Sequence, residues 1–373
     1  MFFLIVLLFT LALNSYVFIR GWQVLPPFFS AKILYPLLFW ALTLLFYVRM
    51  FYGDSFPPSI SPLISTLAFT WLIAVVYFAL IALGVDILRL TNRLFDFFPS
   101  FIKNNLLTSA RITALTAVTF VSLLLAYGRC NFNNPKVTKV TVELAKPIPG
   151  NHVRIVLISD IHLSSYINGS HLDKYIELIN SQNPHLVLIA GDIVDRNIEP
   201  LIDWDISTRF KKIKSKYGVF AISGNHDYYG GERERLYDYL RSSGITLLLD
   251  SVATIAGTVQ IVGREDRTNS KRKELKEILA ETDKNLPIIL MDHQPFGLHE
   301  AVENGVDLQL SGHTHNGQFW PGNLVVKWMY EVGYGYKKIG DTHFYVSSGV
   351  GLWGPKFRIG TFSEVVTIDL KEI

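Results

Sequence analysis

Five short clusters of acidic, amide and imidazole side chains occur in the C-terminal two thirds of this sequence. They read Asp160-x-His162, Gly191-Asp192-x-x-Asp195, Gly224-Asn225-His226-Asp227, Asp292-His293 and Gly312-His313-x-His315. Carboxylate and amide oxygens combined with imidazole nitrogens favour divalent manganese, iron or zinc over calcium. One ion cannot hold so many donors. The clusters therefore predict two cations about 4 Å apart, a spacing that suits in-line displacement at phosphorus.

Each cluster follows an apolar run that predicts a buried strand. The runs are Val153–Ser159, Leu186–Ala190, Val219–Ile222, Pro287–Met291 and Val306–Leu310. Alternate side chains of a strand point the same way, so Asp160 and His162 would project together. Open α/β sheets place ligands at the carboxyl ends of their strands. We therefore expect the five clusters to meet at one sheet edge.

The rest of the region 137–373 alternates between strand-like and amphipathic segments, which predicts one α/β domain with two facing sheets and helices outside. Val137–Glu143 is expected to be an edge strand. Helices are expected at Ser170–Gln182, Trp204–Lys216, Glu232–Ser242 and Lys271–Glu281. Shorter strands are expected at Thr246–Leu249, Thr254–Ala256, Val259–Val262, Thr342–Val346 and Ser363–Leu370.

Singly, these polar residues are weak evidence, because a lone histidine is usually a satisfied polar side chain and GNHD can form an ordinary turn. Together, in this order, they resemble the calcineurin-like metallophosphoesterase family from about Val153 to the C-terminus. The resemblance implies a four-layer αββα sandwich. It implies one metal held by Asp160, His162 and His315, a second held by Asn225, His293 and His313, and Asp192 bridging both. A metal-bridging hydroxide would then attack phosphorus.

The same resemblance gives His226 and Asp227 catalytic roles. His226 would face the substrate, stabilise the transition state and protonate the leaving oxygen, with Asp227 orienting its ring. Asp195 and Asp292 would fix imidazole orientation from outside the ligand set, or would simply cap their loops.

The region 1–130 is predicted to be a membrane anchor of about four helices, because four apolar runs approach the roughly 20 residues that span a bilayer. The runs are Phe2–Ile19, Ile33–Val48, Leu63–Leu83 and Ile112–Tyr127. The charged stretch Asp86–Lys103 is expected to connect the last two. None of the runs carries a central ionisable residue, so an anchor is favoured over a transporter.

The distribution of basic residues predicts the orientation of the chain. The first and third loops carry Arg20, Lys32, Arg89, Arg93 and Lys103. The positive-inside rule places these loops in the cytoplasm and the catalytic domain outside it. The chain is thus expected to be a multi-pass protein of the cell (inner) membrane.

These features predict a membrane-anchored dimetal phosphoesterase, with manganese the favoured metal. Its substrate would be a phosphodiester, pyrophosphate or phosphomonoester of a lipid or cell-envelope molecule. A soluble nucleotide or phosphoprotein substrate, or a non-catalytic membrane scaffold, remain alternatives. The net charge of +3 suggests no nucleic-acid partner, and the single cysteine, Cys130, excludes an internal disulfide. The oligomeric state stays open.

Two further groups have two interpretations each. Arg264, Arg267 and Lys271–Lys273 would face an anionic head group, or would form a solvated helix face. Trp353 and Phe357, within a GVGLWGPKFR stretch similar to the membrane-associated bacterial branch of the family, would touch an acyl chain or pack inside the domain.

Overall fold

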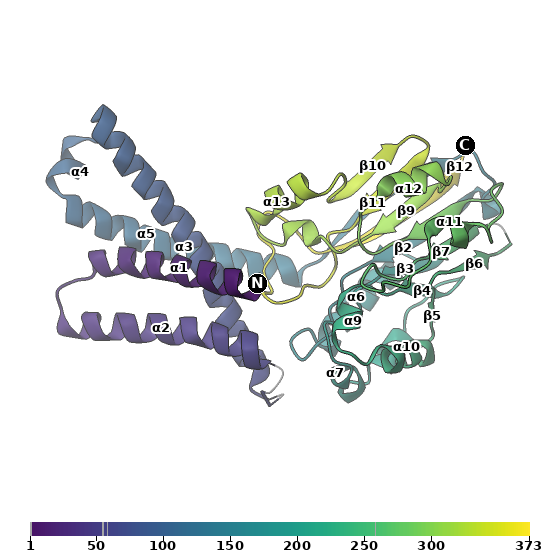
Figure 1. Ribbon diagram of the computed structural model, residues 1–373, viewed down its shortest axis with the longest axis horizontal. Helices are drawn as coiled ribbons and strands as arrows, with labels where there is room; N and C mark the ends of the chain where they lie inside the picture. The colour runs from purple at the N-terminus through teal and green to yellow at the C-terminus, as the bar shows by residue number, and fades with distance from the viewer. Residues whose placement is uncertain (1, 54–55, 58, 258) are drawn as a thin grey trace. The chain divides into compact units, whose positions relative to one another are not determined.

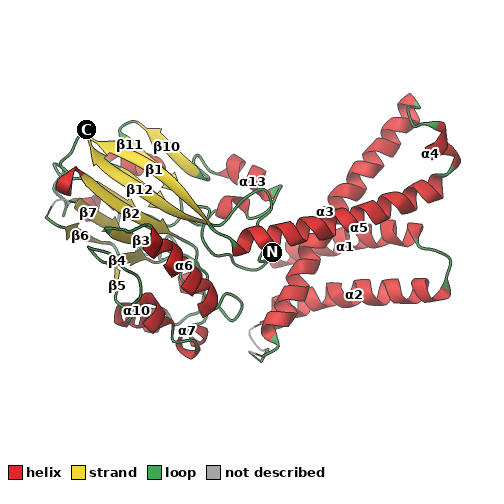
Figure 2. Ribbon diagram, turned by 180° about the vertical axis from the view of Figure 1, so that it is seen from behind, coloured by secondary structure: helices red, strands yellow, loops and turns green. Residues whose placement is uncertain are grey.

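The computed structural model describes residues 2–53, 56–57, 59–257 and 259–373. The chain divides into two compact units, one formed by Met1–Arg129 with Gly354–Lys356 and the other by Cys130–Trp353 with Phe357–Ile373. The long N-terminal segments of the first unit are helices, whereas the second unit combines sheets and helices (Figure 1, Figure 2). The roles assigned to 1–130 and 137–373 as anchor and catalytic domain stay predictions.

In the N-terminal part of the chain, the described residues form four long α-helices and one short one. They are α1 (Phe2–Val24), α2 (Phe29–Tyr52), α3 (Ser61–Phe95), α4 (Ser100–Asn104) and α5 (Leu106–Asn133). All but α4 are long and apolar enough to cross a membrane. The predicted connection Asp86–Lys103 is partly wrong, because α3 continues through the charged residues to Phe95.

Helices α1, α2 and α3 pack on one another and are joined by side-chain hydrogen bonds. Thr43 Oγ1 donates to Asn14 Oδ1 at 2.9 Å and accepts from Trp71 Nε1 at 3.0 Å, so each helix contributes one side chain. Hydrogen bonds of this kind satisfy polar groups that would otherwise be exposed to the lipid acyl chains.

The second unit contains two six-stranded sheets. The first has the order β1 (Lys136–Leu144), β12 (Glu364–Glu372), β2 (His152–Ile158), β3 (Leu186–Ala190), β4 (Val219–Ile222) and β5 (Ile245–Leu247). The second has the order β10 (Gly335–Ile339), β11 (Thr342–Val346), β9 (Leu308–Ser311), β8 (Ile288–Met291), β7 (Val259–Gly263) and β6 (Ser251–Ile255). As predicted, β1 lies at an edge, where it pairs with β12 alone.

Helices cover the outer faces of both sheets, so the predicted four-layer sandwich is confirmed. In β2, Val156 and Ile158 pack toward the helices, whereas Ile155 and Leu157 pack toward the other sheet. This alternation is the two-residue period of a strand buried on both faces. The helices on the first sheet are α6 (Gly169–Ser181), α7 (Glu199–Asp203), α8 (Ile206–Phe210) and α10 (Arg233–Ser242). Those on the second are α11 (Leu275–Leu279) and α12 (Leu298–Glu303).

Two helix predictions need correction. The predicted helix Trp204–Lys216 shortens to α8, which begins after Asp205, a residue with left-handed backbone (φ 48°) that separates α8 from α7. The predicted helix Lys271–Glu281 shortens to α11 alone.

The strand directions bring the polar clusters to one edge. Strands β2, β3 and β4 run parallel to one another, as do β8 and β9. The loops that follow these strands begin with the residues singled out in the sequence. Backbone hydrogen bonds join the first two loops, because the Asp160 N–H donates to Gly191 O and the His162 N–H donates to Asp192 O.

Candidate metal centre

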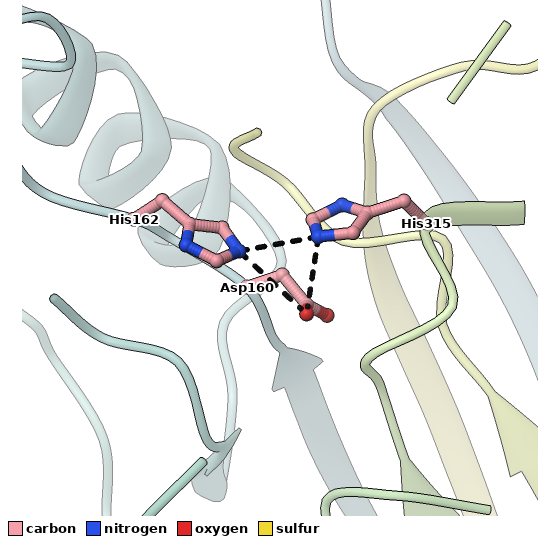
Figure 3. A group of neighbouring side chains, drawn as sticks. All are labelled: Asp160, His162 and His315. Carbon is pink, nitrogen blue, oxygen red and sulfur yellow. Dashed lines mark hydrogen bonds and ion pairs between the residues drawn. The ribbon is translucent and has the colours of Figure 1, made fainter. Parts of the chain in front are cut away.

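Among the described residues, members of all five clusters come together in three groups of potential metal ligands, one of which is His162, Asp195 and His226. The other two groups consist of predicted ligands alone. Asp160, His162 and His315 form the first of these two, and Asp192, His293 and His313 form the second, with donor atoms within 4.8 Å of one another in each. In the first group His162 Nε2 and His315 Nε2 lie 3.1 Å apart, with the Asp160 carboxylate beside them (Figure 3).

Asp192 lies between the two groups. Its Oδ2 is 3.2 Å from His293 Nε2 and 3.6 Å from His162 Nε2. Asn225 joins the second group through its Oδ1, which lies 2.8 Å from His313 Nδ1. The geometry thus gathers all seven predicted ligands, with Asp192 where a bridging carboxylate would be expected. Their roles as ligands stay a proposal.

Five of these seven residues have an unusual backbone. The residues with positive φ angles are Asp160 (54°), His162 (51°), Asp192 (52°), His313 (72°) and His315 (51°). Side-chain-bearing residues rarely adopt this region, and strained backbone clusters at functional sites. Two glycines permit close approach, because a Cβ on Gly224 would meet the Asp192 side chain and one on Gly312 would meet Asp160. Glycine at these two positions therefore allows the backbone to pack directly against the carboxylates of Asp192 and Asp160.

The site buries polar atoms that lack partners. Asp160, His162 and His293 are fully buried. His162 Nδ1, His293 Nε2 and His315 Nδ1 are buried with no hydrogen-bond partner among the described residues. Each such atom costs about 1–3 kcal/mol unless something satisfies it. A cation between His293 Nε2 and Asp192 would supply a partner, so the residues fit a metal.

Electrostatics favour a positive charge in this place. Burial would raise the pKa of Asp192, but the imidazoles of His293 and His162 outweigh it and hold that pKa well below its usual range. Burial, reinforced by the like charge of His293, lowers the pKa of His313 to about 4. Burial also lowers the pKa of His315 well below its usual value. His313 and His315 are therefore neutral at pH 7, which is the form in which imidazole binds metals.

His226 lies beside this centre and contacts a different carboxylate from the one predicted. Its Nδ1 is 2.9 Å from Asp195 Oδ1, and its ring centroid is 4.6 Å from that of His162. Burial opposes the charged ring, but Asp195 and Asp192 together raise the pKa of His226 to about 9. Asp195 also faces His162 Nδ1 at 3.7 Å, so it lies beside two imidazoles, which favours imidazole orientation over the alternative of loop capping.

The predicted orienting role of Asp227 is wrong. Asp227 Oδ2 accepts from the Gly224 N–H at 2.8 Å and Oδ1 accepts from the Val194 N–H at 3.0 Å. The Asp227 side chain turns to two backbone amides that need acceptors, one in its own loop and one in the loop after β3. It holds the loop that carries Asn225 and His226.

Of the two interpretations of Asp292, imidazole orientation is wrong. Of the basic group, Arg264 does not lie on an exposed surface, whereas Arg267, Lys271 and Lys273 do. Asp292 contacts no imidazole but accepts from Arg264 at 3.1 Å and from Arg272 at 3.4 Å. Arg264 is therefore buried, and Arg267 lies over the ring of Phe296, 5.1 Å from its centroid. Phe357 is buried inside the second unit, whereas Trp353 is half exposed with its ring 6.1 Å from that of His226.

Two supporting residues could not be assigned from the sequence. Arg358 is fully buried and donates to the backbone carbonyls of His315 (2.7 Å), Ser348 (2.6 Å), Gly349 (2.9 Å) and Gly351 (3.1 Å). Tyr229 Oη accepts from Asn225 Nδ2 at 3.0 Å and so orients the amide. The only sequence signal for Tyr229 is its position one helical turn after Asn225.

Known proteins share these motifs. Residues 153–317 match the profile of calcineurin-like phosphoesterases. An uncharacterized metallophosphoesterase of Campylobacter jejuni is 34% identical over 258 residues, which cover 67% of this chain and 68% of that protein. The chain belongs to the calcineurin-like phosphoesterase family. Members are metal-dependent phosphoesterases with a dinuclear metal centre, and that level of the prediction is confirmed.

Some relatives are named as membrane proteins. A transmembrane protein with a metallophosphoesterase domain from Danio rerio is 32% identical and covers 71% of this chain. The match spans 64% of that protein, so the chain covers about two thirds of the length of these relatives. Among solved structures, a dimetal phosphatase from Danio rerio is 13% identical, covers 53% of this chain and 88% of its own, and gives a TM-score of 0.34.

Proposed function

We propose that this chain hydrolyses a phosphodiester, pyrophosphate or phosphomonoester of a lipid or another cell-envelope molecule at a membrane surface. The observation that carries the proposal is the position of Asp192 Oδ2, within 3.6 Å of imidazole nitrogens from both donor groups. The same chain has four helices that could cross a membrane. A phosphoesterase held at a bilayer meets lipid head groups at high local concentration.

The chain's own residues would divide the work of metal binding. Asp160, His162 and His315 would hold one divalent cation, Asn225, His293 and His313 would hold the other, and Asp192 would serve both. We favour manganese because the donors are nitrogen and oxygen without sulfur. When bound, the ions supply Lewis acidity, which neutralises phosphoryl charge and lowers the pKa of coordinated water.

His226 is placed to move a proton. Its ring carries a charge at pH 7 because two carboxylates face it, and Nδ1 is held by Asp195, so Nε2 is the atom that donates to the leaving oxygen. The ring of Trp353 borders the imidazole. His226 therefore acts without being a ligand.

We also propose that the second unit lies outside the cytoplasm of the cell membrane, because the basic residues of the first and third loops favour the inner side. Orientation can be tested in a Cys130→Ser chain with a new cysteine at the exposed Lys284. A membrane-impermeant maleimide should label Lys284→Cys in intact spheroplasts. Labelling that requires lysis would reverse the orientation.

The proposed reaction is tested with full-length protein in proteoliposomes supplied with manganese. The substrates are a long-chain lipid pyrophosphate, a lipid phosphodiester, chromogenic mono- and diesters, a nucleotide and a phosphopeptide. We expect the lipid esters to give the highest kcat/KM, and His226→Ala to abolish that turnover. A preference for the nucleotide or phosphopeptide would favour a soluble substrate, and failure to bind manganese would favour a non-catalytic scaffold.

A further inference from the structure

A short helix beside the candidate metal centre carries an apolar face that the described part of the chain leaves uncovered. Helix α13 (Gly322–Met329) has no buried residue. Trp328 is 85% exposed, and Leu324, Val325 and Met329 are each more than half exposed. Residues three and four positions apart share one side of a helix, so these four side chains form a single outer face. Figure 2 shows α13 beyond the ends of β10 and β11.

The opposite side of α13 fixes the helix to the metal-site loop. Val326 packs against Gly333, and Gly322 lies against Gly317 so closely that neither has room for a side chain. Gly317 ends the short helix that begins with His315. A helix of this length would not persist alone in water, so its position depends on these contacts.

The residues that follow α13 also contact the segment around the candidate site. The ring of Tyr330 lies 4.7 Å from that of Phe296 and 6.4 Å from that of His313, measured between centroids. Thr314 Oγ1 donates to the carbonyl of Gly333 at 2.6 Å. Both ends of α13 thus contact the segment His313–Gly317, so the helix borders the loop that carries the candidate ligands His313 and His315.

The other helices of the chain point to a bilayer as the surface that covers this apolar face. Four of its helices could cross a membrane, and only Asn134 and Pro135 separate α5 from β1, so the second unit stays close to any membrane that α5 spans. Trp328 suits the interface between head groups and acyl chains, where indole rings are enriched. Lys327 is exposed beside the apolar face and can extend its charge to lipid phosphates while its stem stays apolar.

We propose that α13 is an interfacial helix whose Leu324, Val325, Trp328 and Met329 face inserts into the bilayer surface. Lipid phosphoesters then reach the metal centre from the plane of the membrane, past Tyr330 and Phe296. This second step rests on the lipid substrate proposed above, whereas insertion does not.

Insertion is tested with full-length protein in vesicles of neutral and anionic phospholipids. In a Cys130→Ser background, single cysteines replace Leu324 or Trp328 and carry an environment-sensitive fluorophore. The control is Lys284→Cys, which precedes β8 and so lies at the sheet edge opposite the site. We expect the two α13 labels to emit at shorter wavelength and to be quenched by spin-labelled lipids, and the control label to be unaffected.

Two results would overturn insertion. Water-like emission at both α13 positions would show that the face stays in solvent. Shielding that lipid quenchers do not reach, and that grows with protein concentration in detergent, would assign the face to a second copy of the chain.

Delivery of lipid is tested with Trp328→Ser, an exposed change outside the metal centre. We expect kcat/KM for a lipid phosphoester in vesicles to fall on the order of tenfold, corresponding to about 1.4 kcal/mol, with the soluble chromogenic ester unaffected. The matched control is Ile202→Ser, which removes an exposed apolar side chain on α7. Equal losses on both substrates would overturn delivery. A wild-type protein inactive on every lipid ester would overturn the proposed substrate. Insertion of α13 would still be tested separately by the emission of the fluorophores at positions 324 and 328.

Discussion

Asp195 Oδ1 lies 2.9 Å from His226 Nδ1 and 3.7 Å from His162 Nδ1, so one carboxylate contacts both the candidate proton donor and a candidate metal ligand. The two histidines come from loops that follow different strands. Asp195 therefore sets the position of the acid relative to the metal centre, which neither loop could do alone.

The substitution Asp195→Asn tests this arrangement. We expect a 10- to 100-fold fall in kcat, roughly the cost of losing a group that orients a ligand or acid, with manganese content unchanged. Metal content is measured by elemental analysis beside the kinetics. Asp227→Asn is the matched control, because its carboxylate contacts only amides and should chiefly lower stability, by about 1–3 kcal/mol. Equal kinetic losses in both variants would contradict the distinction.

Asp192→Asn and His226→Ala should both abolish hydrolysis, for different reasons. The first removes the charge between the two donor groups and should release metal. The second should keep both ions while turnover falls about 10²- to 10⁴-fold, as expected for a lost general acid. Elemental analysis of the purified proteins distinguishes them. A metal-free His226→Ala protein would show that His226 is itself a ligand.

Removing the cations with a chelator should lower the stability of the second unit as well as stop turnover. Without cations, the buried His293 Nε2 has no hydrogen-bond partner among the described residues, and the buried carboxylates Asp160 and Asp192 lose their counterions. Manganese at 100 times its dissociation constant should restore about 2.7 kcal/mol. Hydrogen exchange of the segment His313–Gly317, with and without chelator, measures the effect locally. Exchange in the helices α1 to α3 should not change, and a change there would argue for general unfolding.

Arg358→Lys should destabilise the loops around the site, although it keeps the charge. A lysine ammonium cannot reach the four carbonyls that the guanidinium now serves, so at least about 2 kcal/mol should be lost. Resistance of the full chain to limited proteolysis reports this. Arg241→Lys is the control, because Arg241 is exposed and pairs only with Asp238. Equal protease resistance in both variants would mean that Arg358 is dispensable.

Much of the fold follows from local patterns. The strands β3 and β4 match the apolar runs Leu186–Ala190 and Val219–Ile222 residue for residue, because strands buried on both faces admit no polar residue. Helix α13 had no such signal, since its eight residues are shorter than a periodic pattern needs. The break at Asp205 depends on a left-handed backbone that composition does not reveal.

The meeting of the five clusters was predictable because parallel strands end at one edge, but the contacts behind them were not. Nearness in sequence suggested Asp227 as the partner of His226. The structure uses Asp195 instead, because the loop after β3 bonds to the loop after β2, as in the Leu163–Val194 bridge, and carries Asp195 to the ring. Contacts between loops of this kind depend on how the strands are arranged in the folded sheet, so they could not be predicted from the sequence.

The order of the first sheet constrains how the protein can be made. Strand β12 lies between β1 and β2, and it pairs with β1 in parallel along nine residues and with β2 in the antiparallel sense along six. A ribosome produces β1 and β2 long before β12. Until β12 emerges, β1 has no partner strand and β2 has one open edge, and both can pair with foreign strands.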